Sequence, residues 1–575
     1  MRMILNYMKP YKIRVFWGTT IKLIGALMEL FLPFILAYIV DTLVPLGDFN
    51  QILLFGGLMI VCSILAWVAN IVANRIAAYV SSRMVYNIRQ ASFERIMDLS
   101  SKQVDKLTIS SLETRLTTDT YNIHRFVGAI QRMGVRAPMM FFGGIVMCLT
   151  LQPQLTTVLI LLVPLILFSI GMITWRGVPL FTELQKKIDT MVRIVRENLV
   201  GIRVSKALNT TDREKQRFNE SSRDVAAQEV KATRWMSLNF PIINILLYTG
   251  LTIILMYGGH LVLEGRTHEG VIIAFLSYFI IITNSLLAIN RMFVIYNRAN
   301  TSATRINAIL TQPLASERQV KHVDDKDTSA HIEFVEVSFS YYDEATEEMA
   351  IENVSFSLQH GETLGIIGAT GSGKSTLVNL LMRHYDLLEG MIYINGRSIQ
   401  SIELNELHAK FGVVFQGDFL YKDTIYNNID FGRNLPYEDI IKAAKTAQAY
   451  DFIMEREGQF DSLLASKATN LSGGQKQRLL LTRAIAGRPE ILILDDSVSA
   501  LDYLTESKFR QALKENYPNI TSIIIAQRIS SIQDADKILL LNRGQMLSIG
   551  THDELMANQP IYQEIVKQQM GGLHE

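Results

Sequence analysis

The chain has 575 residues, enough for several domains, and 49% of them are hydrophobic. Its 56 Lys and Arg residues nearly balance 55 Asp and Glu residues. The net charge therefore says nothing about nucleic-acid binding. We expect no nucleic-acid partner. Both cysteines, Cys62 and Cys148, lie in apolar runs, which favours buried small side chains over a disulfide or a metal site.

Apolar runs dominate the N-terminal half of the chain. They occupy residues 15–46, 51–74, 137–175, 235–263 and 271–290. A helix needs about 20 apolar residues to cross a bilayer, and the run 137–175 is long enough for two crossings with a turn at Gln152-Pro153-Gln154 between them. The pattern predicts an all-α transmembrane domain of six helices over residues 1–310.

Lysine and arginine are unevenly distributed around these spans. The short connections at 47–50, 152–154 and 264–270 contain only Arg266, whereas the long segments 75–136 and 176–234 contain many. Since cytoplasmic segments carry the positive excess, we expect the long segments and both termini to be cytoplasmic. Helical continuity breaks at 108–111 and 209–212, and short crossing helices near 111–119 and 204–213 are predicted to contact a cytoplasmic domain.

Two carboxylates accompany the first span. Glu29 lies inside it, where a charge is costly in lipid. It either lines a cavity that favours cationic or polar substrates or forms a structural pair with Lys22 or another helix. Asp41 lies near the outer end of the span and is either a helix-end residue or part of an outer gate.

A polar segment at 311–330 is predicted to be a linker, followed by a soluble α/β domain over 331–575. Within it, the run 368–376 matches the phosphate-loop pattern GxxxxGK[ST] between a strand-like and a helix-like segment. Such a loop wraps a nucleoside triphosphate with backbone N–H groups, a lysine on the phosphates and a hydroxyl on Mg²⁺. The candidate nucleotide-binding residues here are Gly368, Thr370, Gly371, Ser372, Gly373, Lys374, Ser375 and Thr376.

Two further motifs surround this loop in sequence. The buried strand 491–494 ends in Asp495 and Asp496, an arrangement that holds Mg²⁺ through the first carboxylate. Upstream, Leu471 is followed by a serine, two glycines and a glutamine at a helix start, a second anion site: Ser472, Gly473, Gly474 and Gln475. Tyr341 ends a strand and is a candidate to stack on adenine.

Together these motifs resemble one half of an ABC transporter of the exporter type, over essentially the whole chain. The resemblance implies a P-loop nucleotide-binding domain with ATP and Mg²⁺ as cofactors, Tyr341 on the adenine, and Gln416 as a catalytic and metal-binding glutamine beside Ser375 and Asp495. It also implies that Ser499-Ala500-Leu501-Asp502 is the D-loop. The family binds two ATP molecules between two nucleotide domains, each ATP held by the phosphate loop of one and the LSGGQ of the other.

Three departures from the family pattern concern catalysis. The catalytic base is usually a glutamate, but Asp496 stands there and is shorter by one methylene, roughly 1.5 Å of reach. Gln527 replaces the usual switch histidine and cannot become a cation. The segment 465–468 before LSGGQ lacks the usual Gly-Glu-Arg-Gly.

These losses predict ATP binding without efficient turnover. The chain is similar to the degenerate subunit of heterodimeric bacterial multidrug exporters, with a second half-transporter chain as its partner. We expect it to span a bacterial plasma membrane and to export drugs or other small amphipathic compounds. The alternatives are a homodimeric exporter or lipid flippase, in which Asp496 is a working base, and a regulatory ABC protein that does not transport.

Overall fold

The computed structural model describes residues 1–313, 320–323, 325–341, 349–496 and 501–570. The chain forms two compact units. The first comprises Met1–Ile96 and Ser110–Gln312, and the second comprises Met97–Ile109 and Pro313–Glu575.

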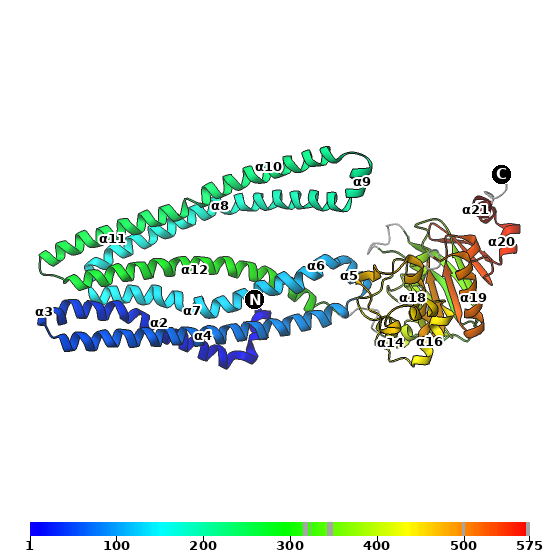
Figure 1. Cartoon of the computed structure of the whole chain (residues 1–575), viewed down its shortest axis with the longest axis horizontal. Coiled ribbons are helices and arrows are strands. Elements are labelled where there is room, and N and C mark those ends of the chain that lie inside the picture. Colours follow the sequence, from blue (N-terminus) through cyan, green and yellow to red (C-terminus); the bar gives the residue numbers. More distant parts are fainter. Residues whose placement is uncertain (314–319, 324, 342–348, 497–500, 571–575) are drawn as a thin grey trace. The chain divides into compact units, whose positions relative to one another are not determined.

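The first unit is entirely helical (Figure 1). Six of its helical stretches are long and apolar enough to cross a membrane, within the residues that the structure describes: Arg2–Leu46, Phe49–Met97, Ile109–Leu151, Pro153–Val200, Thr211–Leu263 and Glu269–Leu310. The six-helix prediction is therefore confirmed. The helices and helical turns are α1 (Arg2–Met8), η1 (Lys9–Tyr11), α2 (Lys12–Tyr38), η2 (Ile39–Leu43), α3 (Val44–Leu46), α4 (Phe49–Met97), α6 (Ile109–Thr114), η3 (Arg115–Asp119), α7 (Thr120–Leu151), α8 (Pro153–Val200), α9 (Ile202–Ala207), α10 (Thr211–Met236), α11 (Asn239–Leu263) and α12 (Glu269–Leu310).

The turns between these helices follow from local chemistry. Pro153 opens α8 because a proline at the first helical position loses no helix hydrogen bond. Gly47 ends α3 at φ +70°, a conformation that glycine adopts without a side-chain clash. In the core, Tyr278 of α12 is fully buried, and its hydroxyl donates a 2.6 Å hydrogen bond to the backbone oxygen of Leu30 in α2. Both cysteines are buried and unpaired.

Two short helices lie close to the predicted breaks but not at all of the predicted positions. The first is α5 (Ser101–Leu107), which ends at Thr108 with φ +61°. The expected stretch 111–119 is instead part of α6 and η3, so the short helix precedes the break rather than following it. The second is α9, which overlaps the predicted stretch 204–213 but begins two residues before it, and α10 follows from Thr211.

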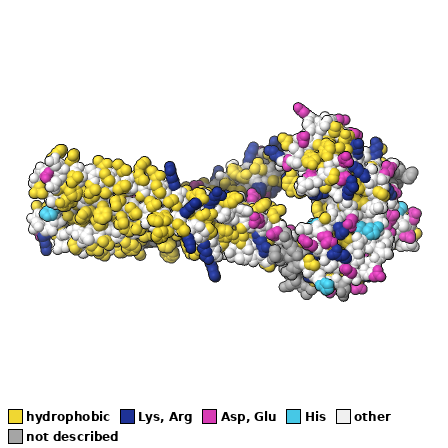
Figure 2. All heavy atoms as spheres, turned by 90° about the horizontal axis from the view of Figure 1, so that it is seen from below, with side chains coloured by type: hydrophobic (Ala, Val, Ile, Leu, Met, Phe, Trp, Pro, Cys, Tyr) yellow, Lys and Arg dark blue, Asp and Glu magenta, His cyan; other side chains and the backbone are white. Residues whose placement is uncertain are grey.

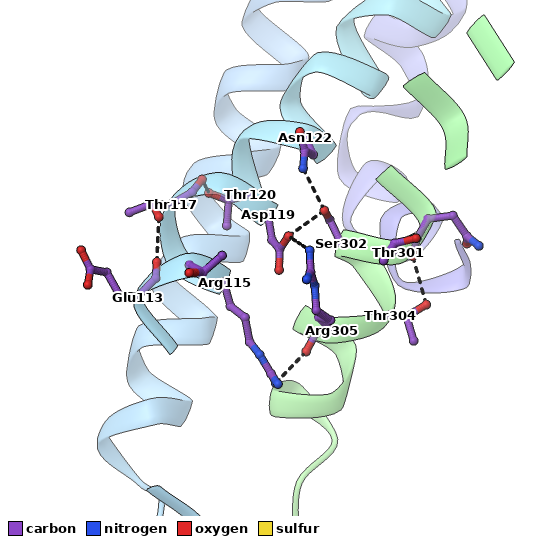
Figure 3. Close-up of polar contacts among 12 residues, drawn as sticks. Glu113, Arg115, Thr117, Asp119, Thr120, Asn122, Thr301, Ser302, Thr304 and Arg305 are labelled. Atoms are coloured by element: carbon purple, nitrogen blue, oxygen red, sulfur yellow. Dashed lines mark hydrogen bonds and ion pairs between the residues drawn. The ribbon is translucent and has the colours of Figure 1, made fainter. Parts of the chain in front are cut away.

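A buried polar cluster joins η3 to the end of α12 (Figure 3). Asp119 is fully buried, and one of its oxygens accepts hydrogen bonds from the Ser302 hydroxyl at 2.7 Å and from Arg305 at 2.6 Å. Asn122 donates to Ser302 at 3.1 Å, and Arg115 donates to the backbone oxygen of Arg305 at 3.1 Å. These bonds fix the C-terminal part of α12 against η3 and α7.

A second polar network lies among α2, α4 and α7. Lys22 is buried and donates to Asn70 at 2.6 Å and to Asn74 at 3.1 Å. Glu29 pairs with Arg136 at 2.5 Å and accepts a hydrogen bond from Asn70 at 2.8 Å. Glu29 therefore forms an ion pair with another helix, the second of the two interpretations offered by the sequence.

The second unit is an α/β domain that carries two sheets, together with α5. A four-stranded antiparallel sheet has the order β2-β1-β4-β5, and a six-stranded sheet has the order β10-β9-β3-β8-β7-β6, parallel except for β10. The strands are β1 (Ile332–Phe339), β2 (Ile351–Leu358), β3 (Thr363–Ile367), β4 (Glu389–Ile394), β5 (Arg397–Ser398), β6 (Phe411–Val414), β7 (Ile491–Asp495), β8 (Thr521–Ile525), β9 (Lys537–Asn542) and β10 (Gln545–Gly550).

Helices and helical turns connect these strands. They are α13 (Lys374–Leu381), α14 (Leu404–Ala409), α15 (Ile425–Asp430), α16 (Tyr437–Thr446), α17 (Tyr450–Met454), η5 (Gln459–Asp461), η6 (Ser466–Ala468), α18 (Gly473–Ala486), α19 (Tyr503–Asn516), η7 (Ile529–Ser531), α20 (His552–Asn558) and α21 (Pro560–Met570). The strands β3, β7 and β8 are apolar and almost wholly buried, as central strands of a parallel sheet are. Their carboxyl ends therefore meet at one edge of the sheet.

Candidate functional site

The phosphate loop leaves the central strand β3 and enters α13, as its sequence predicts. Gly371 and Gly373 have φ values of +80° and +102°, which a residue with a Cβ adopts only at a cost. A Cβ on Gly368 would lie 2.1 Å from the backbone oxygen of Leu541, so only glycine fits beside β9. The loop therefore exposes backbone N–H groups at a helix start, where an anion binds.

A cavity of about 780 Å³ opens over this loop. The cavity brings together most of the predicted site residues. They come from the phosphate loop and from the segments that follow β1, β6, β7 and β8. The predicted residues that line it are Tyr341, Thr370, Gly371, Gly373, Lys374, Ser375, Thr376, Gln416, Asp495, Asp496 and Gln527.

The opposite charges of Lys374 and Asp495 interact within this cavity. The Lys374 ammonium donates to the backbone oxygens of Gly368 at 2.9 Å and Ala369 at 2.8 Å. Burial lowers the pKa of Lys374, and the neighbouring carboxylates oppose that shift. Burial raises the pKa of Asp495, against a hydrogen bond from the Ser375 hydroxyl that favours its charged form. A buried carboxylate beside a cation and a hydroxyl suits the binding of a charged ligand.

Asp496 and Gln527 form a direct pair at the ends of β7 and β8. The Gln527 amide donates a 2.8 Å hydrogen bond to Asp496, whose own N–H donates to the backbone oxygen of Ile525 at 2.9 Å. Asp496 adopts φ +50°, a conformation that aspartate tolerates better than most residues. The two positions at which the sequence departs from the family are thus bonded to one another in the same cavity.

Tyr341 stands at the mouth of the cavity with its ring partly exposed. Its hydroxyl lies 3.1 Å from that of Thr376, and Tyr385 packs edge-on against its ring at 5.2 Å between centroids. The hydroxyl of Tyr385 in turn donates to Asp105 of α5 at 2.6 Å. The short helix α5 is therefore linked by two side chains to the predicted adenine-stacking residue.

The LSGGQ serine and glutamine form a capping box at the start of α18. The N–H of Gln475 donates to the Ser472 hydroxyl at 3.2 Å, and the N–H of Ser472 donates to the Gln475 side chain at 3.1 Å. Ser472, Gly473, Gly474 and Gln475 do not line the cavity, and neither does Asp502, which caps α19 through Thr505. Of the predicted D-loop, Ser499 and Ala500 lie outside the described residues.

Six cavity-lining residues were missed in the sequence: Met349, Ala350, Glu352, Ile525, Arg543 and Gly544. Arg543 and Gly544 form the two-residue turn between β9 and β10, both at positive φ. The sequence Asn542-Arg543-Gly544 between two apolar runs does signal such a hairpin. Nothing in it indicates that the turn reaches the phosphate loop, because that proximity arises from the order of strands in the sheet.

Comparisons with known proteins agree with this architecture. The family described as "ABC transporter transmembrane region" matches residues 15–286, and the family described as "ABC transporter" matches residues 351–499. An uncharacterized ABC transporter ATP-binding protein, YfiB of Bacillus subtilis, is 34% identical over 572 residues, covering 99% of each chain. This chain belongs to the ABC transporters. It joins a membrane domain and an ATPase domain in the manner of an exporter half.

Other relatives show the same extent. The B. subtilis protein YgaD, named provisionally as a multidrug export ATP-binding/permease protein, is 29% identical over 590 residues and covers 98% of each chain. A solved structure of a bacterial Atm1-family ABC exporter with ATP bound has a TM-score of 0.80 at 23% identity, covering 97% of this chain and 99% of that chain. At that identity it establishes the exporter fold.

The ABC half-transporter is thus a multi-pass membrane protein whose ATPase domain binds ATP and drives export. A half-transporter implies a dimer with a second half. The geometry of the cavity bears on which residues hold the nucleotide. It also bears on whether the second half is a different chain.

Proposed function

We propose that this ABC half-transporter is the hydrolysis-impaired subunit of a heterodimeric exporter of drugs or other amphipathic compounds. The observation that supports this most is the bonded pair of Asp496 and Gln527 in the ATP cavity. A general base must come within hydrogen-bond distance of its water. Asp496 is a methylene shorter than the usual glutamate and is held by a neutral amide.

In the proposed mechanism the cavity binds ATP without turning it over efficiently. Tyr341 stacks on the adenine, the phosphate-loop N–H groups and Lys374 hold the phosphates, and Gln527 keeps Asp496 bonded. Hydrolysis takes place mainly at the second site, which combines the partner's phosphate loop with the LSGGQ of this chain. The N–H groups of Gly473 and Gly474 suit that role, because they lie in the first turn of α18, where the helix does not use them.

The residues around Asp495 fit a magnesium ion. A hard cation with oxygen ligands matches a buried carboxylate bonded to a serine hydroxyl, with a glutamine side chain in the same cavity. We propose that Asp495, Ser375 and Gln416 hold Mg²⁺ with the nucleotide. The ion would supply charge neutralisation on the phosphates, while Lys374 orients them.

Further parts of the proposal concern organisation. We propose a transmembrane domain over residues 1–310, a linker over 311–330 and a nucleotide-binding domain over 331–575. The distribution of arginine and lysine supports cytoplasmic termini in a bacterial plasma membrane. The name of YgaD, which describes multidrug export, supports amphipathic drugs as substrates.

The ATPase activity of the purified chain tests the proposal. The wild-type chain should bind Mg-ATP but hydrolyse it slowly, and a double variant, Asp496→Glu with Gln527→His, should hydrolyse it at least about tenfold faster, since positioned bases contribute roughly 10²–10⁴-fold. Lys374→Ala in the double variant is the control and should abolish the gain. Brisk turnover by a verified wild-type homodimer would contradict the proposal and favour the homodimeric exporter or flippase.

A further inference from the structure

Five arginines lie on two packed helices of the membrane domain. Arg125, Arg132 and Arg136 follow one another at helical spacing on one side of α7, and Arg291 and Arg298 do so on α12. We call these five residues the arginine face. Long cationic side chains at such spacing on neighbouring helices repel one another unless an anion lies among them.

The chain supplies very little negative charge to this face. Residues 120–151 of α7 and 270–310 of α12 contain no aspartate or glutamate. Arg136 is paired with Glu29 of α2, and a second oxygen of that carboxylate is used by Asn70. Within the described residues, Arg125, Arg132, Arg291 and Arg298 have no carboxylate partner. The buried Lys22 adds a further positive charge near Arg132 and Arg136.

Three of the arginines surround one hollow of about 250 Å³ between α7 and α12. Its lining combines charge with apolar surface: Asn122, Arg125, Arg291, Val294, Ile295 and Arg298. Asn122 also donates to Ser302 in the polar cluster around Asp119, which fixes the two helices beside the hollow (Figure 3). The hollow therefore presents three guanidinium groups and two aliphatic side chains to a single ligand.

The arginines of the hollow lie farther along their helices than the thickness of a hydrocarbon core. At about 1.5 Å per residue, Arg125 lies about 39 Å from the end of α7 at Leu151, and Arg291 and Arg298 lie about 33 and 44 Å from the start of α12 at Glu269. The hydrocarbon core of a bilayer is about 30 Å thick. On the space-filling surface, dark blue Lys and Arg side chains gather where the yellow apolar surface of the membrane domain gives way (Figure 2).

Positive residues are common at the cytoplasmic boundary of membrane proteins. That general tendency does not require arginine in place of lysine, nor convergence on one hollow. Guanidinium groups are the better match for phosphate and carboxylate, because their planar fork donates two parallel hydrogen bonds. Apolar side chains in the same hollow indicate a ligand that carries a hydrocarbon portion.

We propose that the arginine face binds the anionic head of an amphiphile, a phosphate or carboxylate group attached to an apolar tail. The head lies among Arg125, Arg291 and Arg298, and the tail lies along Val294 and Ile295. That such an anionic amphiphile is also the exported compound rests on the proposed function. The binding itself does not, since it depends on this chain alone.

Binding to the full-length chain in nanodiscs of uncharged lipid tests the proposal. The probes are dioctanoyl phosphatidic acid and dioctanoyl phosphatidylcholine, which has the same acyl chains but no net charge. Binding of each probe is measured by native mass spectrometry. Phosphatidic acid should bind at least about tenfold more tightly, because its phosphate monoester carries more negative charge and, unlike the phosphate of phosphatidylcholine, is not offset by a choline cation. A triple variant, Arg125→Gln, Arg291→Gln and Arg298→Gln, should reduce that preference to less than about twofold.

The control removes the same charge elsewhere. The variant Arg193→Gln, Arg196→Gln and Arg203→Gln changes exposed arginines of α8 and α9 and should leave the preference unchanged. Equal affinity for the two lipids in the wild-type chain, or an equal loss in both triple variants, would overturn the proposal. Displacement by inorganic phosphate at concentrations similar to those of the lipid would overturn the requirement for a tail.

An ATP arm separates the two sources of such a ligand. A transported amphiphile should lose affinity when Mg-ATP is added to the complex of this chain with its partner, because transport requires different affinities in different states. A resident membrane lipid should keep its affinity under the same conditions. Failure of the ATPase test leaves this binding test intact, so the two proposals fail separately.

Discussion

Replacing Asp119 by alanine removes the acceptor at the centre of the cluster that fixes α12 to η3 and α7. Two hydrogen bonds are lost, from Ser302 and from Arg305. A bond between neutral groups contributes about 1 kcal/mol and one to a charged group about 1.5–3 kcal/mol. Ser302 would remain fully buried without this acceptor. The Arg305 side chain is 48% exposed, so it can hydrate, and the cost falls below the about 3–5 kcal/mol of a wholly buried pair.

We therefore expect Asp119→Ala to destabilise the membrane domain by about 2–3 kcal/mol. In thermal unfolding of the detergent-solubilised chain, that is a decrease in Tm of roughly 3–5 °C for a domain of this size. Asp119→Asn keeps an acceptor oxygen and should cost about 1 kcal/mol. Thr301→Ala is the matched control on the same helix, since the Thr301 hydroxyl donates to the backbone oxygen of Asn297 within α12, and it should shift stability by less than about 0.5 kcal/mol.

A double-mutant cycle separates the ion pair from the rest of the cluster. Asp119→Asn and Arg305→Gln should be non-additive by at least about 0.5 kcal/mol, because the two side chains are in contact. Additive effects, together with a Tm for Asp119→Ala equal to that of Thr301→Ala, would refute the reasoning. The cluster would then lie where these helices meet without contributing to the stability of the membrane domain.

Three further predictions concern other parts of the chain. Asp41→Ala removes the carboxylate that accepts a 2.5 Å hydrogen bond from the Gly270 N–H. The variant should raise the outward-open population and leave nucleotide binding intact. Unchanged distances across the outer helix ends, measured with and without ATP, would leave Asp41 as a helix-end residue. Tyr385→Phe deletes the bond to Asp105 and should leave ATP affinity within about twofold but reduce stimulation of the ATPase by transported substrate. Burial and the neighbouring His360 lower the pKa of His331 to about 4, below its unfolded value of about 6.5, so the unfolded state binds more protons between these values. Stability of the nucleotide domain should therefore fall as the pH drops from 6.5 towards 4, and His331→Gln should flatten that decline in thermal unfolding.

Local sequence patterns were sufficient to predict much of the fold of this protein. The phosphate loop and its flanking strand and helix depend on neighbours in sequence, and so do the six spans. The position of α5 was missed because the break at Thr108 says that a helix ends there but not on which side the short helix lies. The partner of Glu29 was likewise open, since Arg136 on α7 reaches it only through tertiary packing.

In the candidate site, too, residues within local motifs could be predicted, whereas residues placed by strand pairing could not. Lys374, Ser375 and Asp495 could be predicted because each belongs to a motif with known chemistry. Arg543 could not, because its place in the cavity depends on β9 pairing with β3. The bond between Gln527 and Asp496 also required the parallel pairing of β7 with β8, which aligns the ends of both strands.

The helix α5 changes how the nucleotide domain is attached. The second unit includes Met97–Ile109 as well as everything after Gln312, so the chain passes between the units three times rather than once. The helices α4 and α6 of the membrane domain therefore both lead directly into the unit that carries the ATP cavity. The hydrogen bond between Asp105 and Tyr385 joins the segment between these two helices to the rest of that unit.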